Sequence, residues 1–190
     1  DDRMLNQFSR TELLLGHDAM EKLAGCRVAV FGIGGVGGYA VEALARSGVG
    51  ALDLIDDDRV CLTNLNRQLI ATRKTVGQYK VDAMEQRLHD INPNVEIHTY
   101  KMFYMPDTAD QVDLTQYDYV VDAVDTVTAK LELVCRAKRA GVSFSFVSFR
   151  DSIRMDEILK YIDSKPISLV FDDFGTLCYK EDGTPFLENA

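Results

Sequence analysis

The sequence predicts an α/β protein with a Rossmann-like, mostly parallel sheet that is covered by helices on both faces. Two observations carry this prediction. Short apolar runs rich in β-branched residues alternate along the chain with helical stretches, and the connections between them are short. That alternation favours a parallel sheet. The first apolar run is followed by Gly32-Ile33-Gly34-Gly35-Val36-Gly37, which fits a tight turn from a strand into a helix.

Each element follows from its local pattern. An apolar stripe that includes Leu13 and Met20 predicts a helix over residues 5–23, with a break at residues 16–18. Buried parallel strands are expected where apolar runs end in turn residues, and a further strand is expected where residues 95–100 alternate in polarity. Helices are expected where apolar residues recur at helical spacing and a glycine or proline follows. The expected strands are residues 26–31, 51–55, 95–100, 117–124 and 142–149, and the further expected helices are residues 37–46, 76–91 and 128–140.

The last forty residues differ from the rest in their charge. Residues 151–190 contain nine acidic and four basic side chains, a net charge of -5. A helix over residues 151–162, a strand over 166–171 and a hairpin over 177–186 are expected there. The domain organisation is therefore one domain over residues 1–149, with an N-terminal helical segment at 5–23, and an acidic tail over residues 150–190.

The composition excludes several classes of protein. Among 190 residues, 46% are hydrophobic and 27% are charged, as in soluble globular proteins. No apolar run approaches the roughly 18 residues of a membrane span. The net charge of -9 argues against nucleic-acid binding through overall charge, but it leaves room for a local basic patch. Four cysteines without a C-x-x-C pair favour neither a zinc knuckle nor a dithiol site, and indicate a reduced, cytoplasmic protein.

The glycine-rich sequence predicts a phosphate site. Gly32 allows the tight turn, Gly34 lets a phosphate approach the backbone, and Gly37 lets helix and strand pack closely, so that the phosphate meets the N–H groups that open the helix. Asp56 ends the next strand, where a carboxylate can accept hydrogen bonds from ribose hydroxyls. These features indicate a nucleotide with an unphosphorylated ribose, and leave NAD, FAD, S-adenosylmethionine and ATP open.

Charged residues further along the chain favour ATP. An arginine such as Arg67 can pair two phosphate oxygens, and a lysine such as Lys80 can neutralise charge that develops on a leaving phosphate. An aspartate at the end of a strand, such as Asp125, can hold magnesium beside phosphate oxygens. An oxidoreductase has no need of such a set around a phosphate tail.

The order of these motifs resembles a known superfamily. The glycine loop is followed by D-x-D-x-V-x-x-x-N-x-x-R-Q at residues 56–68, V-G-x-x-K at 76–80 and D-A-x-D at 122–125. In this the chain is similar to the ubiquitin-activating-type, or sulfur-carrier adenylyltransferase, superfamily. Within it the chain most resembles the branch that dehydrates threonylcarbamoyladenosine in tRNA. The resemblance covers about residues 5–142, and residues 150–190 match no pattern of the family.

The resemblance implies a role for each matching residue. Glycines of the loop would cradle the nucleotide, Asp56 would bind the ribose with Asp58 close by, and Asp125 would hold magnesium. Arg10 matches an arginine that reaches into the active site of the other subunit, which implies a homodimer. The full nucleotide-binding set is Gly32, Gly34, Gly35, Gly37, Asp56, Asp58, Asn64, Arg67, Gln68, Lys80 and Asp125, and the catalytic set is Arg10, Asn64, Arg67, Lys80 and Asp125.

The resemblance also implies a reaction. A carboxylate attacks the α-phosphate of ATP, pyrophosphate leaves and an acyl-adenylate forms. In the dehydratase branch the carboxylate belongs to the threonyl group of a modified adenosine beside the tRNA anticodon, and the activated group closes into a ring with net loss of water. Three alternatives stay open. They are activation of the C-terminal glycine of a ubiquitin-like sulfur carrier, nucleotide binding without catalysis, and a dinucleotide oxidoreductase.

Overall fold

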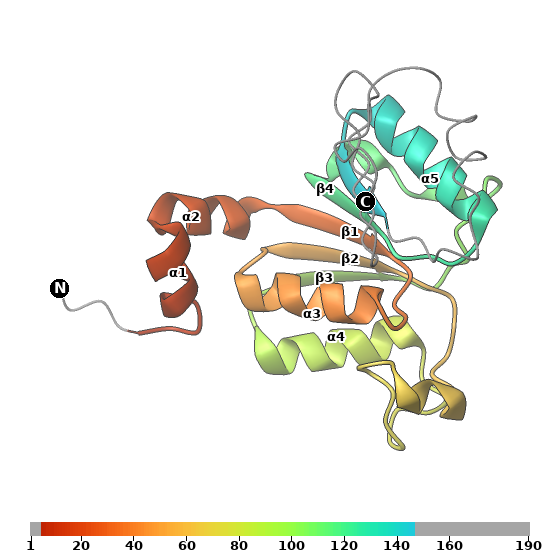
Figure 1. Ribbon diagram of the computed structural model, residues 1–190, viewed down its shortest axis with the longest axis horizontal. Coiled ribbons are helices and arrows are strands. Elements are labelled where there is room, and N and C mark those ends of the chain that lie inside the picture. The colour runs from red at the N-terminus through yellow and green to blue at the C-terminus, as the bar shows by residue number, and fades with distance from the viewer. Residues whose placement is uncertain (1–4, 147–190) are drawn as a thin grey trace, which may run out of the picture.

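The computed structural model describes residues 5–146 and confirms the parallel α/β prediction (Figure 1). Its sheet has five strands in the order β3-β2-β1-β4-β5, and each neighbouring pair is parallel. The strands are β1 (Arg27–Phe31), β2 (Ala51–Ile55), β3 (Glu96–Tyr100), β4 (Tyr119–Asp122) and β5 (Ser143–Phe146). The helices are α1 (Ser9–Leu15), α2 (His17–Gly25), α3 (Gly37–Ser47), α4 (Lys80–Ile91) and α5 (Val127–Ala140), with 3-10 turns η1 (Leu62–Asn66), η2 (Ala109–Gln111) and η3 (Leu114–Gln116).

The strand order reverses at β1. The chain winds from β1 through β2 to β3 on one side, and then crosses back to β4 and β5 on the other side. The loops that leave β1 and β4 therefore part from each other at the carboxyl edge of the sheet. Such a reversal creates the crevice in which doubly wound sheets bind their ligands.

Helices cover both faces of the sheet and make two apolar layers. Helices α3 and α4 lie on one face, and α5 lies on the other (Figure 1). Alternate residues of β1 enter the two layers: Val30 packs with Met84 of α4, whereas Phe31 packs with Leu133 of α5. Because both faces of β1 are covered, its residues 28–31 are buried and apolar, which is the pattern that predicted this strand.

The N-terminal helices lie beyond the amino end of β1, away from the carboxyl edge (Figure 1). Gly16, with φ 84°, separates α1 from α2 and confirms the predicted break. Phe8 and Met20 pack over Gly48, with side-chain atoms 3.5 and 3.1 Å from the position that a Cβ of Gly48 would take. These contacts anchor the helical segment, although α1 itself has no buried residue.

One helix begins later than the sequence indicates. The prediction placed its start at Val76, but α4 starts at Lys80. Gly77 adopts a φ of 90°, and its N–H donates to the Val60 carbonyl, while the Val60 N–H donates to the Gln78 carbonyl. Residues 73–77 therefore form a turn and Tyr79 is extended, so α4 cannot begin earlier.

The remaining bounds agree with the predictions to within a few residues. The strand expected at 117–124 is the shorter β4, and the strand expected at 142–149 is described up to residue 146. The helix, strand and hairpin expected in residues 150–190 lie outside the described residues. No helix in the described part of the chain is long and apolar enough to cross a membrane.

Candidate functional site

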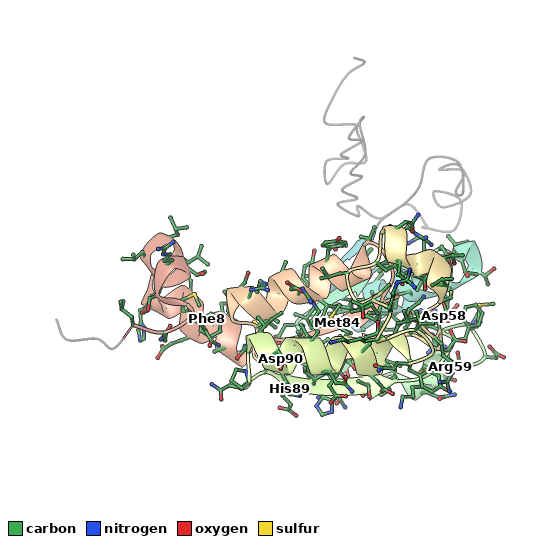
Figure 2. The ribbon with its side chains drawn as sticks, turned by 90° about the horizontal axis from the view of Figure 1, so that it is seen from below. Phe8, Asp58, Arg59, Met84, His89 and Asp90 are labelled. Carbon is green, nitrogen blue, oxygen red and sulfur yellow. The ribbon has the colours of Figure 1, made fainter. Side chains whose placement is uncertain are left out.

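A cavity of about 680 Å³ opens at the carboxyl edge of the sheet, where the strand order reverses. Its walls come from the glycine loop after β1, the acidic run after β2, the η1 region and the loop after β4. Figure 2 shows Asp58 at this end of the molecule and Phe8 at the opposite end. The sequence brings its motifs together here because parallel strands all end at the same edge.

The glycine loop follows from steric demands at two positions. Gly32 has a φ of 88°, and a Cβ there would lie 2.6 Å from the Ala123 carbonyl oxygen. A Cβ on Gly37 would lie 1.7 Å from the Gly32 carbonyl oxygen. Glycine is therefore the residue that fits at both positions. This close packing turns the chain sharply from β1 into α3.

The middle of the loop presents backbone N–H groups to the cavity. Gly34, Gly35 and Val36 line it, and within residues 5–146 their N–H groups have no backbone or side-chain acceptor. A Cβ at Gly34 would meet nothing closer than Gln68 Nε2 at 3.9 Å. Free N–H groups at the start of a helix attract anions, so this wall suits a phosphate group.

Asp56 ties the loop to the end of β2. Its Oδ2 accepts a hydrogen bond from the Ile33 N–H at 2.7 Å, and its Oδ1 accepts one from the Asp58 N–H at 2.8 Å. Burial raises the pKa of the Asp56 carboxyl above its ordinary value, and the positive charge of Lys80 partly opposes this effect. The carboxylate is thus fixed in orientation at the edge of the cavity.

Lys80 holds a buried positive charge beside two carboxylates. Its side chain is 8% exposed, and its Nζ lies 2.5 Å from Asp58 Oδ2 and 3.9 Å from Asp56 Oδ2. The Asp58 side chain is 66% exposed, so it can turn toward solvent when an anion enters. The Lys80 ammonium can then bind the entering anion while it stays in place.

Two buried amides lie in and beyond η1. Asn64 Oδ1 accepts a hydrogen bond from the Cys61 N–H at 2.9 Å, which fixes the start of the turn. Gln68 also lines the cavity, and its Oε1 is buried without a hydrogen-bond partner in the described structure. A buried acceptor of this kind calls for a donor from a ligand or water.

Arg67 completes the polar side of the cavity. Its Nη1 donates to the Thr63 carbonyl at 3.2 Å and to Asn66 Oδ1 at 3.0 Å. Its aliphatic stem lies over Gly35, whose Cβ position is 3.6 Å from Arg67 Cγ. The exposed guanidinium therefore stands above the loop that offers free N–H groups, and it retains donors for an anion.

Part of the cavity wall is apolar, and sequence reasoning missed it. Met102, Phe103 and Tyr104 follow β3 and line the cavity together with Val124 and Ala129. The available signal was the run Met102 to Met105 directly after a predicted strand. A cavity with apolar and polar walls suits a ligand with a flat base at one end and charge at the other.

The loop after β4 is held by a buried ion pair that the sequence also did not reveal. Asp122 Oδ1 accepts hydrogen bonds from Lys130 Nζ at 2.9 Å and from the Val124 N–H at 3.0 Å. Burial raises the pKa of the Asp122 carboxyl to about 6, and Lys130 opposes this rise. The pair lies behind the segment that carries Asp125, whose exposed carboxylate lines the cavity.

The predicted residues divide into three groups. Ten of them line the cavity, while Gly37 is buried behind the loop that it shapes and Arg10 lies on α1 at the far end of the molecule. The ten that line the cavity are Gly32, Gly34, Gly35, Asp56, Asp58, Asn64, Arg67, Gln68, Lys80 and Asp125.

Three carboxylates in the described structure lie close enough together to share a cation. They belong to Asp56, Asp57 and Asp58, and one oxygen of each lies within 4.8 Å of the others.

These features define the class of protein, a doubly wound α/β protein with a glycine loop that suits phosphate. Beside the loop, at the strand reversal, lies a polar arc made of Asp56, Asn64, Arg67, Gln68 and Lys80. The chain belongs to the ThiF family, whose model matches residues 8–149. This match confirms the resemblance to the adenylating superfamily.

Named relatives agree with this assignment. The chain is 53% identical over 131 residues to the tRNA threonylcarbamoyladenosine dehydratase of Bacillus subtilis (strain 168), a match that covers 69% of this chain and 52% of that protein. A crystal structure of the E. coli tRNA N6-threonylcarbamoyladenosine dehydratase in complex with ATP has a TM-score of 0.75 and 39% identity, and covers 78% of this chain and 61% of that one. The chain thus spans about half the length of the curated dehydratases that it matches.

A second kind of relative extends further. The molybdopterin-synthase adenylyltransferase of Escherichia coli (strain K12) is 35% identical over 194 residues, and the match covers 100% of this chain and 72% of that protein. It reaches across residues 150–190, where the sequence showed no recognised pattern.

Proposed function

We propose that this protein uses ATP to adenylate a carboxylate, and that the carboxylate belongs to threonylcarbamoyladenosine in tRNA. The observation that carries the proposal is the polar arc of the cavity. Lys80, Arg67 and the free N–H groups of the glycine loop surround one space, with Asp56 at its edge. Cationic groups and N–H donors that converge in this way suit a polyphosphate.

The two walls suggest how the nucleotide lies. Asp56 is fixed by two backbone donors and still offers oxygen lone pairs to ribose hydroxyls. The apolar wall around Phe103 suits the base. The phosphates then extend over the glycine loop toward Arg67 and Lys80.

The chemistry that we propose requires positioning and charge neutralisation. A carboxylate oxygen attacks the α-phosphorus, the bond to the bridging oxygen of the β-phosphate breaks, and pyrophosphate leaves with both electrons of that bond. Lys80 and Arg67 would stabilise the added negative charge. An internal nucleophile of the acceptor would then displace AMP, which carries away one carboxylate oxygen, and the ring closes with net loss of water.

Asp125 fits a role in holding magnesium. Its carboxylate is exposed on the cavity wall, and Mg²⁺ is usually bound by one or two carboxylates together with phosphate oxygens and waters. The ion would supply neutralisation of the phosphate charge. Asp58 and Asp57 are near enough to Asp56 to contribute as well.

The relatives support the proposed acceptor, and features of α1 support the proposed assembly. The dehydratases act on tRNA by name, and a reaction of ATP with tRNA would take place in the cytoplasm. Arg10 is exposed on a helix that lies away from the cavity of its own chain, and the same helix exposes Leu13 and Leu14. We propose a homodimer in which α1 brings Arg10 to the cavity of the other subunit.

A second candidate acceptor is the C-terminal glycine of a ubiquitin-like sulfur carrier. The match to a molybdopterin-synthase adenylyltransferase over the whole chain favours it. The adenylation step would be the same, because it acts on a carboxylate in both cases. The two candidates differ in what brings the carboxylate to the cavity and in the step that follows adenylation.

Calorimetric titration with ATP, with and without magnesium, tests the nucleotide site. We expect ATP to bind in a magnesium-dependent way and more tightly than NAD. The Arg67→Ala, Lys80→Ala double variant is expected to weaken binding at least tenfold, whereas Lys22→Ala on α2 is expected to match the wild type. Tighter binding of NAD than of ATP would overturn the proposal.

Pyrophosphate release identifies the acceptor. We expect release from ATP when tRNA that carries threonylcarbamoyladenosine is added, and none with tRNA that lacks the modification. Release with a small protein ending in Gly-Gly would favour the sulfur-carrier alternative. ATP binding without release in either case would indicate a nucleotide-binding relative without catalysis.

A further inference from the structure

The segment between Asp58 and Asp82 has an unusual charge. It contains five basic residues and no acidic residue, although the whole chain has 30 acidic and 21 basic side chains. Lys80 belongs to the cavity already described. The other four, which we call the basic segment, are Arg59, Arg67, Arg73 and Lys74.

The charges of the basic segment have no carboxylate partners within residues 5–146. Arg73 and Lys74 are exposed, and neither forms an ion pair there. Elsewhere in the described structure, arginines are usually paired, as Arg87 is with Glu42 and Arg136 is with Asp110. Like charges that gather without counter-charges repel one another, so a cluster of this kind suits an external anion.

The backbone that carries these charges is well anchored. Thr75 Oγ1 donates to the Ile70 carbonyl at 2.6 Å and accepts from the Thr72 N–H at 2.9 Å. The guanidinium of Arg59 lies 3.8 Å from the centre of the Tyr79 ring and donates to the Gly77 carbonyl at 2.7 Å. A surface that is held in place before binding loses less entropy when a partner arrives.

The basic segment also adjoins the cavity. Arg67 lines the cavity, and Arg59 follows directly after Asp58, which lines it too. Figure 2 shows Asp58 and Arg59 at the same end of the molecule. In Figure 1, the segment that follows η1 extends outward beside the start of α4. Positive charge therefore continues from the wall of the cavity onto the surface next to it.

We propose that the basic segment binds the sugar-phosphate backbone of RNA next to the nucleotide whose carboxylate enters the cavity. This inference rests on the proposed function and names the surface that the RNA acceptor uses. Phosphates spaced along a strand match several separate cations, and guanidinium groups bind phosphate in a bidentate way. Because the chain as a whole has a net negative charge, a local basic surface would also help to set the orientation of the RNA.

The salt dependence of RNA binding tests the proposal. Fluorescence anisotropy with labelled tRNA transcript is measured between 50 and 200 mM salt for the wild type and for Arg73→Gln, Lys74→Gln. Each phosphate contact contributes about 0.7–0.9 to the slope of log K against log salt. Loss of two contacts should lower that slope by roughly 1.4–1.8. The affinity ratio of wild type to variant should then be about tenfold larger at 50 than at 200 mM salt.

A matched control removes the same charge elsewhere. Arg46→Gln, Arg139→Gln takes one arginine from α3 and one from α5, neither of which lines the cavity. We expect it to keep the wild-type slope. A basic-segment variant that behaves like this control overturns the proposal, as does a wild type that binds no tRNA. Loss of binding to an acidic carrier protein with unchanged RNA binding overturns it as well.

Magnesium-ATP titration of the same variants separates this inference from the proposed function. Arg73 and Lys74 do not line the cavity, so their replacement should leave ATP binding unchanged. Intact ATP binding with no effect of the variant on RNA would refute the RNA surface alone. Failure of the wild type to bind ATP would refute the proposed adenylation, while the salt slope would still report on the surface.

Discussion

At the scale of single residues, the loop after β4 depends on one buried pair. Lys130 and Asp122 are 4% and 1% exposed in their side chains, and they are joined at 2.9 Å. Removing one partner of such a pair leaves an uncompensated charge in the interior. We expect Lys130→Met to lower the free energy of unfolding by about 3–5 kcal/mol, as measured by urea denaturation.

Two further variants check the cause of this loss. Lys130→Met combined with Asp122→Asn should recover more than half of the lost stability, because Asp122 is then no longer a buried charge without its partner. Arg46 is a surface partner of Glu42, and its own side chain is 56% exposed. Arg46→Gln should therefore lower the free energy of unfolding by less than about 1 kcal/mol. Equal losses for Lys130→Met and Arg46→Gln would contradict the importance of the buried pair.

Gly37 offers a second test at this scale, since its neighbour in α3 is a natural control. A Cβ at Gly37 would meet the Gly32 carbonyl oxygen at 1.7 Å, whereas one at Gly38 would meet only the flexible end of Met84 at 3.4 Å. We expect Gly37→Ala to destabilise the protein by at least about 2 kcal/mol and to weaken ATP binding. Gly38→Ala should change stability by no more than about 1 kcal/mol. An unchanged dissociation constant for Gly37→Ala would show that the loop does not shape the site.

At the scale of elements, the sequence was sufficient where a pattern is local. Strand β2 lies where the apolar run predicted it, and the residues of the glycine loop take the places that their steric demands require. The start of α4 was missed because it depends on hydrogen bonds between Gly77 and Val60, which no local periodicity reveals.

Only part of the candidate site could be predicted from local sequence patterns. Its polar residues come from motifs that end parallel strands, so they converge by topology. The apolar wall with Phe103 depends on packing between segments that are distant in sequence. The pairing of Lys130 with Asp122 is closer in sequence, but it depends on how the start of α5 turns back over the end of β4. Phe103 and Lys130 belong to no motif, so only the three-dimensional structure shows what each of them contacts.

The exposed leucines of helix α1 lead to a prediction about assembly. Leu13 and Leu14 are 85% and 86% exposed, which is costly for leucine unless a partner covers them. We expect Leu13→Ser, Leu14→Ser to shift the protein from dimer to monomer in sedimentation experiments. Tyr39→Ser, which removes another exposed apolar side chain from α3, should leave the dimer intact. A wild type that sediments as a monomer at micromolar concentration would contradict the proposed homodimer.

At the scale of the whole molecule, the proposed dimer divides each active site between two chains. The cavity supplies Lys80, and α1 of the other subunit would supply Arg10. We expect Arg10→Ala and Lys80→Ala each to abolish pyrophosphate release, and mixtures of the two to regain it. In a mixed dimer the Arg10→Ala chain keeps its own Lys80 and receives Arg10 from its partner, so one of its two sites is complete.

The size of this recovery is fixed by counting. When equal amounts of the two variants exchange subunits at random, half of the dimers are mixed, and each has one complete site. The mixture should therefore reach about a quarter of the wild-type activity. If Arg10 served the cavity of its own chain, or if the protein worked as a monomer, every chain in the mixture would lack one required group. The mixture would then remain as inactive as either variant, so the result decides whether catalysis is shared between subunits.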